Sequence, residues 1–413
     1  MREVASRTFS SFSVPSFRLM WSADIALNWA EFMEIIILSW FVLEQTESPL
    51  ILGIFAALRF TGTLAAPFFG VVVDRFGRRL IFLMSRASFV VLSSTILVLS
   101  FMSMLSIFAV LLLAAFVGFS RTMDNIVRQS VLPDVVGESR LSNGVALSRT
   151  GRDVTQIIGP VCGGILMEVA GIGLSYILVV LLYSLSLLLV FLVKGLPGAI
   201  VSSYSTVSSS VLKNLFEGFR YVKSERLLVG LLVVAFVVNL TAFPLNQTLL
   251  AVSAKDVMRV GAYELGWLVG AYSFGSLLGS LLIGSLPSLG SAGKIMFIGS
   301  VFWHIGIIAM AFMEWFYPSI PLLILVGCAQ SFSMVTMAMM ILRYTSPEMR
   351  GRILGLRQLA VYGLPLGLLL SGYVAEDFGI FVALVLNGVI GIVLLLLSLW
   401  FWPVMFSRQR FME

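Results

Sequence analysis

Long apolar runs separated by short polar segments make up most of the chain. A helix that spans a bilayer needs about 20 predominantly apolar residues. The runs are continuous rather than alternating between apolar and polar positions, which favours helices over the strands of a barrel. We therefore expect twelve transmembrane helices, near residues 17–43, 49–72, 80–100, 104–123, 142–168, 172–194, 227–250, 264–286, 293–313, 318–340, 351–375 and 379–402.

Composition supports a lipid environment for these runs. Hydrophobic residues make up 59% of the chain and charged residues only 12%, which is too few charges for the surface of a water-soluble domain. Residues 1–16 lack the apolar core of a cleaved signal, and we expect none. Cys162 and Cys328 both fall inside predicted spans, so they do not indicate a secreted disulfide framework.

The basic residues lie mainly on one side of the twelve-helix arrangement. The opposite side holds only Lys255 and Arg259. Because short loops rich in Lys and Arg stay on the cytoplasmic side, this asymmetry predicts a protein of the cytoplasmic membrane with both termini in the cytoplasm. The net charge of +6 therefore reports topology, and we expect a bilayer rather than nucleic acid as the partner of the basic residues.

The two halves of the chain repeat each other. A glycine pattern in the second predicted span returns in the eighth at an offset of about 213 residues: Leu52, Gly53, Gly62 and Gly70 match Leu265, Gly266, Gly275 and Gly284. Such a parallel repeat predicts two six-helix bundles with a substrate path between them. The predicted domains are residues 1–194, a cytoplasmic linker at 195–226 whose second part forms a basic amphipathic helix, and residues 227–413.

The loop after the second predicted span has a distinctive pattern. It reads Gly-Val-Val-Val-Asp-Arg-Phe-Gly-Arg-Arg over residues 70–79. Glycine permits a tight turn and a close helix approach, and arginines hold the loop in the cytoplasm. This pattern resembles the loop between the second and third helices of the major facilitator superfamily, which consists of secondary transporters. The matching residues are Gly70, Asp74, Arg75, Gly77, Arg78 and Arg79.

The resemblance implies a cytoplasmic gate around this loop. At the end of the fourth predicted span, Asp124 and Arg128 share a helix face with Arg121. The resemblance places Asp124 against Arg78, and Asp74 toward the start of the eleventh helix, as contacts that close the cytoplasmic side. The alternative is that these charges only establish topology.

Polar residues inside the predicted spans are candidates for coupling. Asp24, Asn28 and Glu31 lie within about 60° of one another on the first helix. A charge at the bilayer centre costs about 2.5–3.5 kcal/mol, so it needs a partner, a proton or water. We predict that Glu31 and Asp24 bind protons or cations; the alternative is a structural ion pair. Arg59 in the second span needs one of these carboxylates as counter-ion, either as a static brace or as a switch.

A proline-glycine segment in the fifth predicted span refines the resemblance. Gly159, Pro160, Gly163 and Gly164 are similar to the Gly-Pro-x-x-Gly-Gly segment of family members that exchange drugs for protons, although Thr155 replaces a further glycine. Together with segments such as Phe17-Arg18-Leu19-Met20-Trp21, this pattern resembles the branch with macrolide-efflux and enterobactin-exporter proteins. The resemblance therefore implies export.

Two features of the second half complete the candidates. Asn239, Asn246 and Gln247 lie around Pro244 in the seventh predicted span. Uncharged hydrogen-bonding groups beside a helix break predict substrate contacts, with hydrogen bonding between helices as the alternative. His304, the only histidine, is expected to be a packing residue rather than a proton relay.

These features predict an all-α membrane transporter that exports an amphipathic small molecule, such as a drug, macrolide or siderophore-like compound. We expect a monomer that works by alternating access, is driven by a proton gradient, and needs no cofactor. The sequence contains no phosphate-binding loop, metal cluster or catalytic set, so we expect no enzyme activity. The alternatives are an importer or facilitator of the same fold, a receptor or scaffold without transport activity, and a membrane enzyme.

Overall fold

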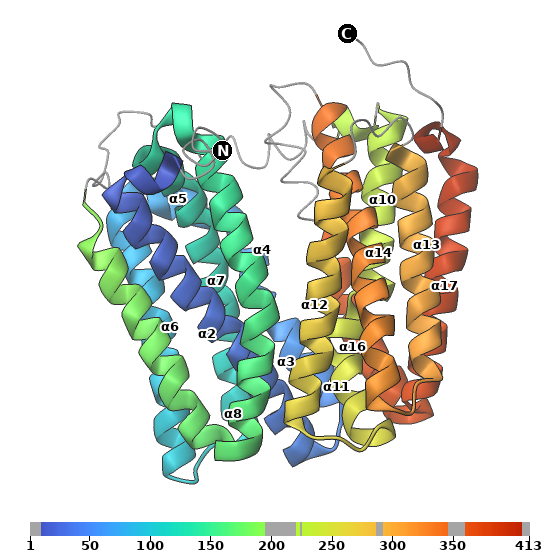
Figure 1. The fold of residues 1–413 in the computed structure, drawn as a ribbon, viewed down its shortest axis with the longest axis horizontal. Coiled ribbons are helices and arrows are strands. Elements are labelled where there is room, and N and C mark those ends of the chain that lie inside the picture. Colours follow the sequence, from blue (N-terminus) through green and yellow to red (C-terminus); the bar gives the residue numbers. More distant parts are fainter. Residues whose placement is uncertain (1–9, 195–219, 224, 286–291, 346–359, 407–413) are drawn as a thin grey trace. The chain divides into compact units, whose positions relative to one another are not determined.

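The computed structural model describes residues 10–194, 220–223, 225–285, 292–345 and 360–406. Every regular element in this part of the chain is a helix (Figure 1). The predicted all-α membrane fold is therefore confirmed. Most of the predicted linker at 195–226, including the start of its amphipathic helix, lies outside the described residues.

The first half of the chain supplies a series of long helices and one broken helix. The broken helix corresponds to the second predicted span and consists of three pieces, α3 to α5. The elements are η1 (Ser10–Ser13), α2 (Pro15–Thr46), α3 (Pro49–Leu58), α4 (Thr61–Leu64), α5 (Ala66–Phe76), α6 (Arg78–Phe101), α7 (Ile107–Val136), η2 (Glu138–Arg140) and α8 (Leu141–Leu192).

The second half begins with another interrupted helix. Its α-helical pieces alternate with two π-helical turns, η3 and η4. The elements are α10 (Arg226–Thr241), η3 (Leu245–Leu249), α11 (Leu250–Val252), η4 (Ser253–Val257), α12 (Ala262–Gly284), α13 (Ala292–Ala311), α14 (Phe316–Arg343), α16 (Gly363–Phe378), α17 (Ile380–Phe401) and η6 (Pro403–Phe406).

Within the described residues, nine helical segments are long and apolar enough to cross a membrane. The second predicted span is not among them because it is broken into α3, α4 and α5. The fifth and sixth predicted spans are merged in α8, whose helix is interrupted at Gly171. The eleventh is described only from residue 360 onward, and its helix, α16, has 16 residues. The count of twelve spans thus remains a prediction.

Glycine occupies several of the turns that reverse the chain. Gly77 between α5 and α6, Gly171 within α8, and Gly379 between α16 and α17 have φ angles of 86°, 67° and 87°. Residues with a Cβ atom rarely adopt this region, whereas glycine enters it without steric hindrance. The Gly77 turn confirms that the 70–79 loop reverses the chain between two helices.

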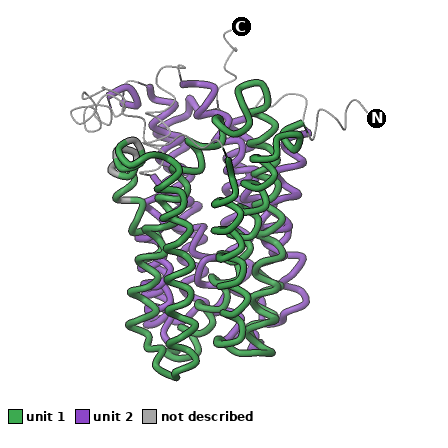
Figure 2. The backbone as a smooth tube through the Cα atoms, turned by 90° about the vertical axis from the view of Figure 1, so that its left-hand side faces the viewer, with its two compact units in different colours: residues 1–47, 58–203, 261–270 green, residues 48–57, 204–260, 271–413 purple. Residues whose placement is uncertain are grey.

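Contacts divide the chain into two compact units (Figure 2). Unit 1 consists of residues 1–47, 58–203 and 261–270, and unit 2 of residues 48–57, 204–260 and 271–413. The start of α3 therefore packs with helices of the second half of the chain, and the start of α12 packs with helices of the first half. The boundaries predicted from the sequence remain a prediction.

Apolar side chains cover much of the outer surface of the helices. Phe108, Val169, Tyr317 and Trp400 are each 76–82% exposed. In water such surfaces would be unfavourable, whereas a bilayer solvates them. The long α2 is the most enclosed of the nine candidate spans, with 78% of its most apolar stretch buried. Its packing against α7 and α8 places its acidic residues in the interior of unit 1.

Candidate functional site

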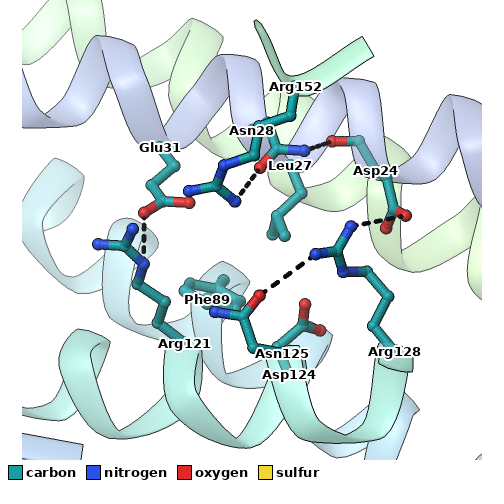
Figure 3. Close-up of a pocket in the computed structure, with 10 residues that line it drawn as sticks. All are labelled: Asp24, Leu27, Asn28, Glu31, Phe89, Arg121, Asp124, Asn125, Arg128 and Arg152. Atoms are coloured by element: carbon teal, nitrogen blue, oxygen red, sulfur yellow. Dashed lines mark hydrogen bonds and ion pairs between the residues drawn. The ribbon is translucent and has the colours of Figure 1, made fainter. Parts of the chain in front are cut away.

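A network of buried charges crosses the interior of unit 1. Its acidic members are Asp24 and Glu31 on α2 and Asp124 on α7, and each is at most 4% exposed. Arginines from neighbouring segments approach these carboxylates, and Figure 3 shows three of them, Arg121, Arg128 and Arg152, pointing toward one space. Buried carboxylates require such partners because an isolated charge is strongly disfavoured away from water.

Arg86 on α6 is the centre of this network. Its Nη2 atom lies 2.6 Å from Asp24 Oδ1, and its Nε atom lies 2.7 Å from Asp124 Oδ1. Its Nη1 atom also donates to Ser186 Oγ on α8, at 2.7 Å. One guanidinium group, 1% exposed, therefore connects four helices. Arg86 was not predicted from the sequence, although a lone arginine inside an apolar run is the same signal that identified Arg59.

The structure corrects the predicted pairing of Asp124 with Arg78. Asp124 instead pairs with Arg86 and accepts a hydrogen bond from Ser85 Oγ at 3.0 Å, while Arg78 pairs with Asp134. The two acids lie at different positions along the axis of α7. Asp124 and Asp134 are separated by about 15 Å at 1.5 Å per residue, and Arg78 at the start of α6 reaches only the later one.

Glu31 forms the second part of the network. Its Oε1 atom lies 2.8 Å from Nε of Arg121 on α7 and 4.0 Å from Nη2 of Arg59. Glu31, one of the two predicted counter-ions of Arg59, is thus its neighbour, but Arg121 is the closer partner of this carboxylate. Arg121 is 24% exposed in its side chain, so this ion pair lies at the accessible edge of the network.

Asn28 and two further arginines complete a small cavity. Asn28 accepts a hydrogen bond from Arg152 Nη1 at 3.2 Å, and Arg128 lies 3.6 Å from Asp24. The cavity has a volume of about 10 Å³, close to the space that a single buried water molecule occupies. It is lined by Asp24, Leu27, Asn28, Glu31, Phe89, Arg121, Asp124, Asn125, Arg128 and Arg152 (Figure 3).

Glu34 lies apart from this cavity, although it follows Glu31 by less than one turn. Both of its carboxylate oxygens accept hydrogen bonds of 3.0 Å, one from the Tyr176 hydroxyl and one from the Tyr183 hydroxyl of α8. Glu34 is only 1% exposed. The sequence analysis gave this residue no role, and the two tyrosines were not identified because nothing in their spacing pairs them with α2.

The predicted gate residues are only partly described. Arg75 and Arg79 flank the Gly77 turn and are exposed. The surroundings of Gly70 and the side chain of Asp74 are not described, and the start of the predicted eleventh helix lies outside the described residues. Arg128, which we had assigned to the gate, lies 3.6 Å from Asp24 at the cavity. The gate assignment of Asp74 therefore remains a prediction.

The antiporter-like segment is a close-packing surface of α8. A Cβ atom on Gly159 would lie 2.6 Å from Phe32 Cβ, and one on Gly163 would lie 2.7 Å from the Met33 carbonyl oxygen. On its other side, Gly164 meets the backbone at Ala262, the first residue of α12. Pro160 lies between these glycines inside the helix. The segment therefore holds α8 against α2 and against the start of α12.

The candidate residues of the second half belong to unit 2. Asn239 donates to the Ala235 carbonyl at 2.8 Å, within its own helix. Asn246 and Gln247 lie in the η3 turn, and the Asn246 Oδ1 atom is buried without a hydrogen-bond partner among the described residues. An unpaired amide oxygen in a π-helical turn is a typical feature of a functional position.

His304 has partners for both ring nitrogens. Nε2 lies 2.8 Å from Thr241 Oγ1, and Nδ1 lies 2.7 Å from the Ser300 carbonyl oxygen, to which it donates. The side chain is fully buried. These contacts agree with the predicted packing role.

Comparisons with known proteins place this site in context. A family model described as transmembrane secretion effector matches residues 6–407. The chain is similar to the multidrug efflux pump Tap of Mycolicibacterium fortuitum, with 26% identity over 357 residues that cover 84% of this chain and 86% of Tap.

Solved transporter structures share the fold. The nucleoside transporter NupG matches with a TM-score of 0.72 and 15% identity, covering 94% of this chain and 99% of NupG. A bacterial homologue of the human lysosomal transporter Spinster matches with a TM-score of 0.71 and 14% identity, covering 95% of this chain and 98% of that chain. At these identities the likeness shows the fold alone.

Proposed function

The chain belongs to the transmembrane secretion effector family of major facilitator transporters, and from this premise we propose that it exports an amphipathic small molecule in exchange for protons. A multi-pass membrane transporter of this family takes small-molecule substrates. We further propose that it resides in the cytoplasmic membrane with both termini in the cytoplasm, works as a monomer and uses no cofactor.

Export is supported by two separate observations. The relative with 26% identity is named as a multidrug efflux pump. The Gly159–Gly164 segment, which resembles that of drug-proton antiporters, packs α8 tightly against α2 and α12. Neither observation depends on the buried charge network, so together they favour efflux of a drug-like compound over uptake of a metabolite.

The contact between Glu31 and Arg121 is the single observation that carries the proton coupling. An ionised Glu31 forms an ion pair with Arg121 at the accessible edge of the cavity, with 2.8 Å between Oε1 and Nε. A proton on Glu31 would remove the negative charge and weaken its hold on both Arg121 and Arg59. Asp24 is a second candidate, whose carboxylate is held at 2.6 Å by the buried Arg86.

The size of this effect is sufficient for coupling. Coupling free energies between two sites are typically about 1–3 kcal/mol. Loss of the Glu31–Arg121 ion pair in one conformation only, if it contributes this amount, would shift a two-state equilibrium by a factor of about 5 to 150. Protonation of one carboxyl group would thus be enough to bias a transporter between two orientations of its binding site.

Accumulation assays in cells test this proposal. Efflux-deficient cells that express the chain would be loaded with macrolides, cationic dyes and catecholate siderophores, with and without a protonophore. We expect lowered accumulation of at least one compound, abolished by the protonophore. Raised accumulation of a compound would show uptake and contradict export, and lowered accumulation that resists the protonophore would contradict proton coupling.

A further inference from the structure

Glu376 caps the start of a helix from the other half of the chain. It lies near the end of α16, and its Oε2 atom accepts hydrogen bonds from Ser48 Oγ at 2.6 Å and from the Leu50 N–H at 3.1 Å. The Ser48 hydroxyl oxygen in turn accepts from the Ile51 N–H at 3.1 Å. The first turn of α3 therefore depends on a carboxylate that lies more than 320 residues away in sequence.

Glu168 caps the start of α12 in the same way. It belongs to the first straight part of α8, and its Oε2 atom accepts from the Ala262 N–H at 3.0 Å. The neighbouring Gly261 N–H donates to Glu264 within the same turn, also at 3.0 Å. This cap also joins the two halves of the chain, but here a carboxylate of the first half caps a helix of the second half.

Glycine contacts accompany both caps. At the first junction, a Cβ atom on Gly53 would lie 2.6 Å from the Leu368 carbonyl oxygen, and one on Gly372 would lie 2.8 Å from the Pro49 carbonyl oxygen. At the second junction, a Cβ atom on Gly266 would lie 2.5 Å from the Pro160 carbonyl oxygen. Each junction thus brings two helix backbones into direct contact.

The sequence spacing shows that the two junctions are built alike. In both capping helices a glycine precedes the glutamate by four residues, as Gly164 and Glu168 and as Gly372 and Glu376. Residues four apart lie on one face of a helix, so the glycine packs where the carboxylate reaches the next turn. The two caps are separated by 208 residues, close to the repeat offset of the chain.

The caps suit contacts that have to form and break. A carboxylate at a helix N-terminus satisfies free N–H groups and interacts favourably with the helix dipole. This contact is directional, and it is lost when the helix ends separate by a few ångströms. Water then solvates both partners, so breaking the contact carries a moderate rather than a prohibitive penalty.

We propose that Glu168 and Glu376 are a matched pair of latches, which hold the α8–α12 and α16–α3 junctions closed in one stage of the transport cycle and release them in another. This inference rests on the proposed alternating-access cycle, because each junction joins helices of opposite halves of the chain. In the predicted topology both glutamates lie on the side opposite the cytoplasm, so the latches would control that side of the path.

Hydrogen exchange of the backbone amides measures the latches directly. The full-length protein in lipid nanodiscs would be compared with Glu376→Gln and Glu168→Gln, which keep the side-chain size and remove the charge. The control is Glu314→Gln, because Glu314 is an exposed acid between α13 and α14. Ser48→Ala, which removes only a hydroxyl group, serves as a second variant at the first junction.

We expect Glu376→Gln and Ser48→Ala to accelerate exchange at residues 50–53 by about 5- to 30-fold, the range for loss of a helix cap. Glu168→Gln should accelerate exchange only at residues 262–266. Glu314→Gln should leave the exchange of both segments unchanged. Unchanged exchange in the three junction variants would overturn the latches.

A transport assay distinguishes a failure of this inference from a failure of the proposed function. The double variant Glu168→Gln with Glu376→Gln should change turnover more than the substrate concentration at half-maximal rate. Accelerated exchange with unaltered turnover would overturn the role in the cycle. If the wild-type protein exports nothing in the panel, the proposed function fails while the exchange experiment still decides whether the caps hold the junctions.

Discussion

At the scale of single residues, unit 1 depends on Arg86. Its guanidinium group is the nearest cation to both Asp24 and Asp124, at 2.6 and 2.7 Å. Removing one partner of a buried ion pair leaves an uncompensated charge, and that penalty exceeds the net contribution of the intact pair. Disrupting the network would therefore destabilise the protein by more than the intact network stabilises it.

Arg86→Gln should destabilise the protein strongly, because two buried carboxylates would lose their cation. We expect a loss of about 3–5 kcal/mol, seen as a large fall in the melting temperature of the purified protein. Combining Arg86→Gln with Asp24→Asn and Asp124→Asn should restore part of this loss, since neither position would then carry a buried negative charge. A single variant as stable as the wild type would contradict the central role of Arg86.

The sequence predicted the acids of this site better than their partners. Asp24 and Glu31 could be identified because a carboxylate inside an apolar helix needs an explanation. Their partners could not, because pairing depends on the height at which antiparallel helices lie beside each other. This is why Arg78 was assigned to Asp124 although it reaches Asp134, and why the contact of Glu34 with Tyr176 was missed.

At the scale of helices, glycines determine how closely the elements approach. Gly118 on α7 faces the turn between α3 and α4, where a Cβ atom would lie 2.5 Å from the Arg59 carbonyl oxygen. No ordinary rotation of a side chain relieves a clash with backbone atoms. The position of Arg59, and thus its distance to Glu31, is therefore set by the absence of a side chain at Gly118.

Gly118→Ala should lower stability by about 1–3 kcal/mol, the usual range for overpacking in a tight interior. Gly284→Ala is the matched control, because a Cβ atom on Gly284 near the end of α12 meets nothing within 4 Å. Thermal unfolding of both purified variants measures the difference. Equal melting temperatures would show that α7 and the α3–α4 turn can separate without penalty.

The positions of the helices were largely predictable, but only one of their interruptions was. Continuous apolar runs locate α6, α12, α13 and α17 within a few residues. The helix break at Pro244 was predicted from the sequence, whereas the π-helical form of the turn that follows it and the break between α3 and α4 near Arg59 were not. Such interruptions follow from packing against neighbouring helices.

At the scale of the whole molecule, the family and fold are those of transporters that alternate access to a site inside the membrane. The exchanged segments, residues 48–57 and 261–270, show that each half of the chain contributes a helix start to the other compact unit. The internal repeat was readable from the sequence, whereas this exchange was not, because it depends on contacts between segments about 100 to 320 residues apart.

The most direct test of the account measures coupling in proteoliposomes with an imposed pH gradient of either sign. It would use a transported compound from the panel and compare the wild type with Glu31→Gln. The control is Glu44→Gln, an exposed acid near the end of the same helix, α2. We predict that net flux reverses with the gradient in the wild type and in Glu44→Gln, whereas Glu31→Gln exchanges substrate without responding to the gradient. A wild-type response in Glu31→Gln would contradict the assignment of proton coupling to this carboxylate.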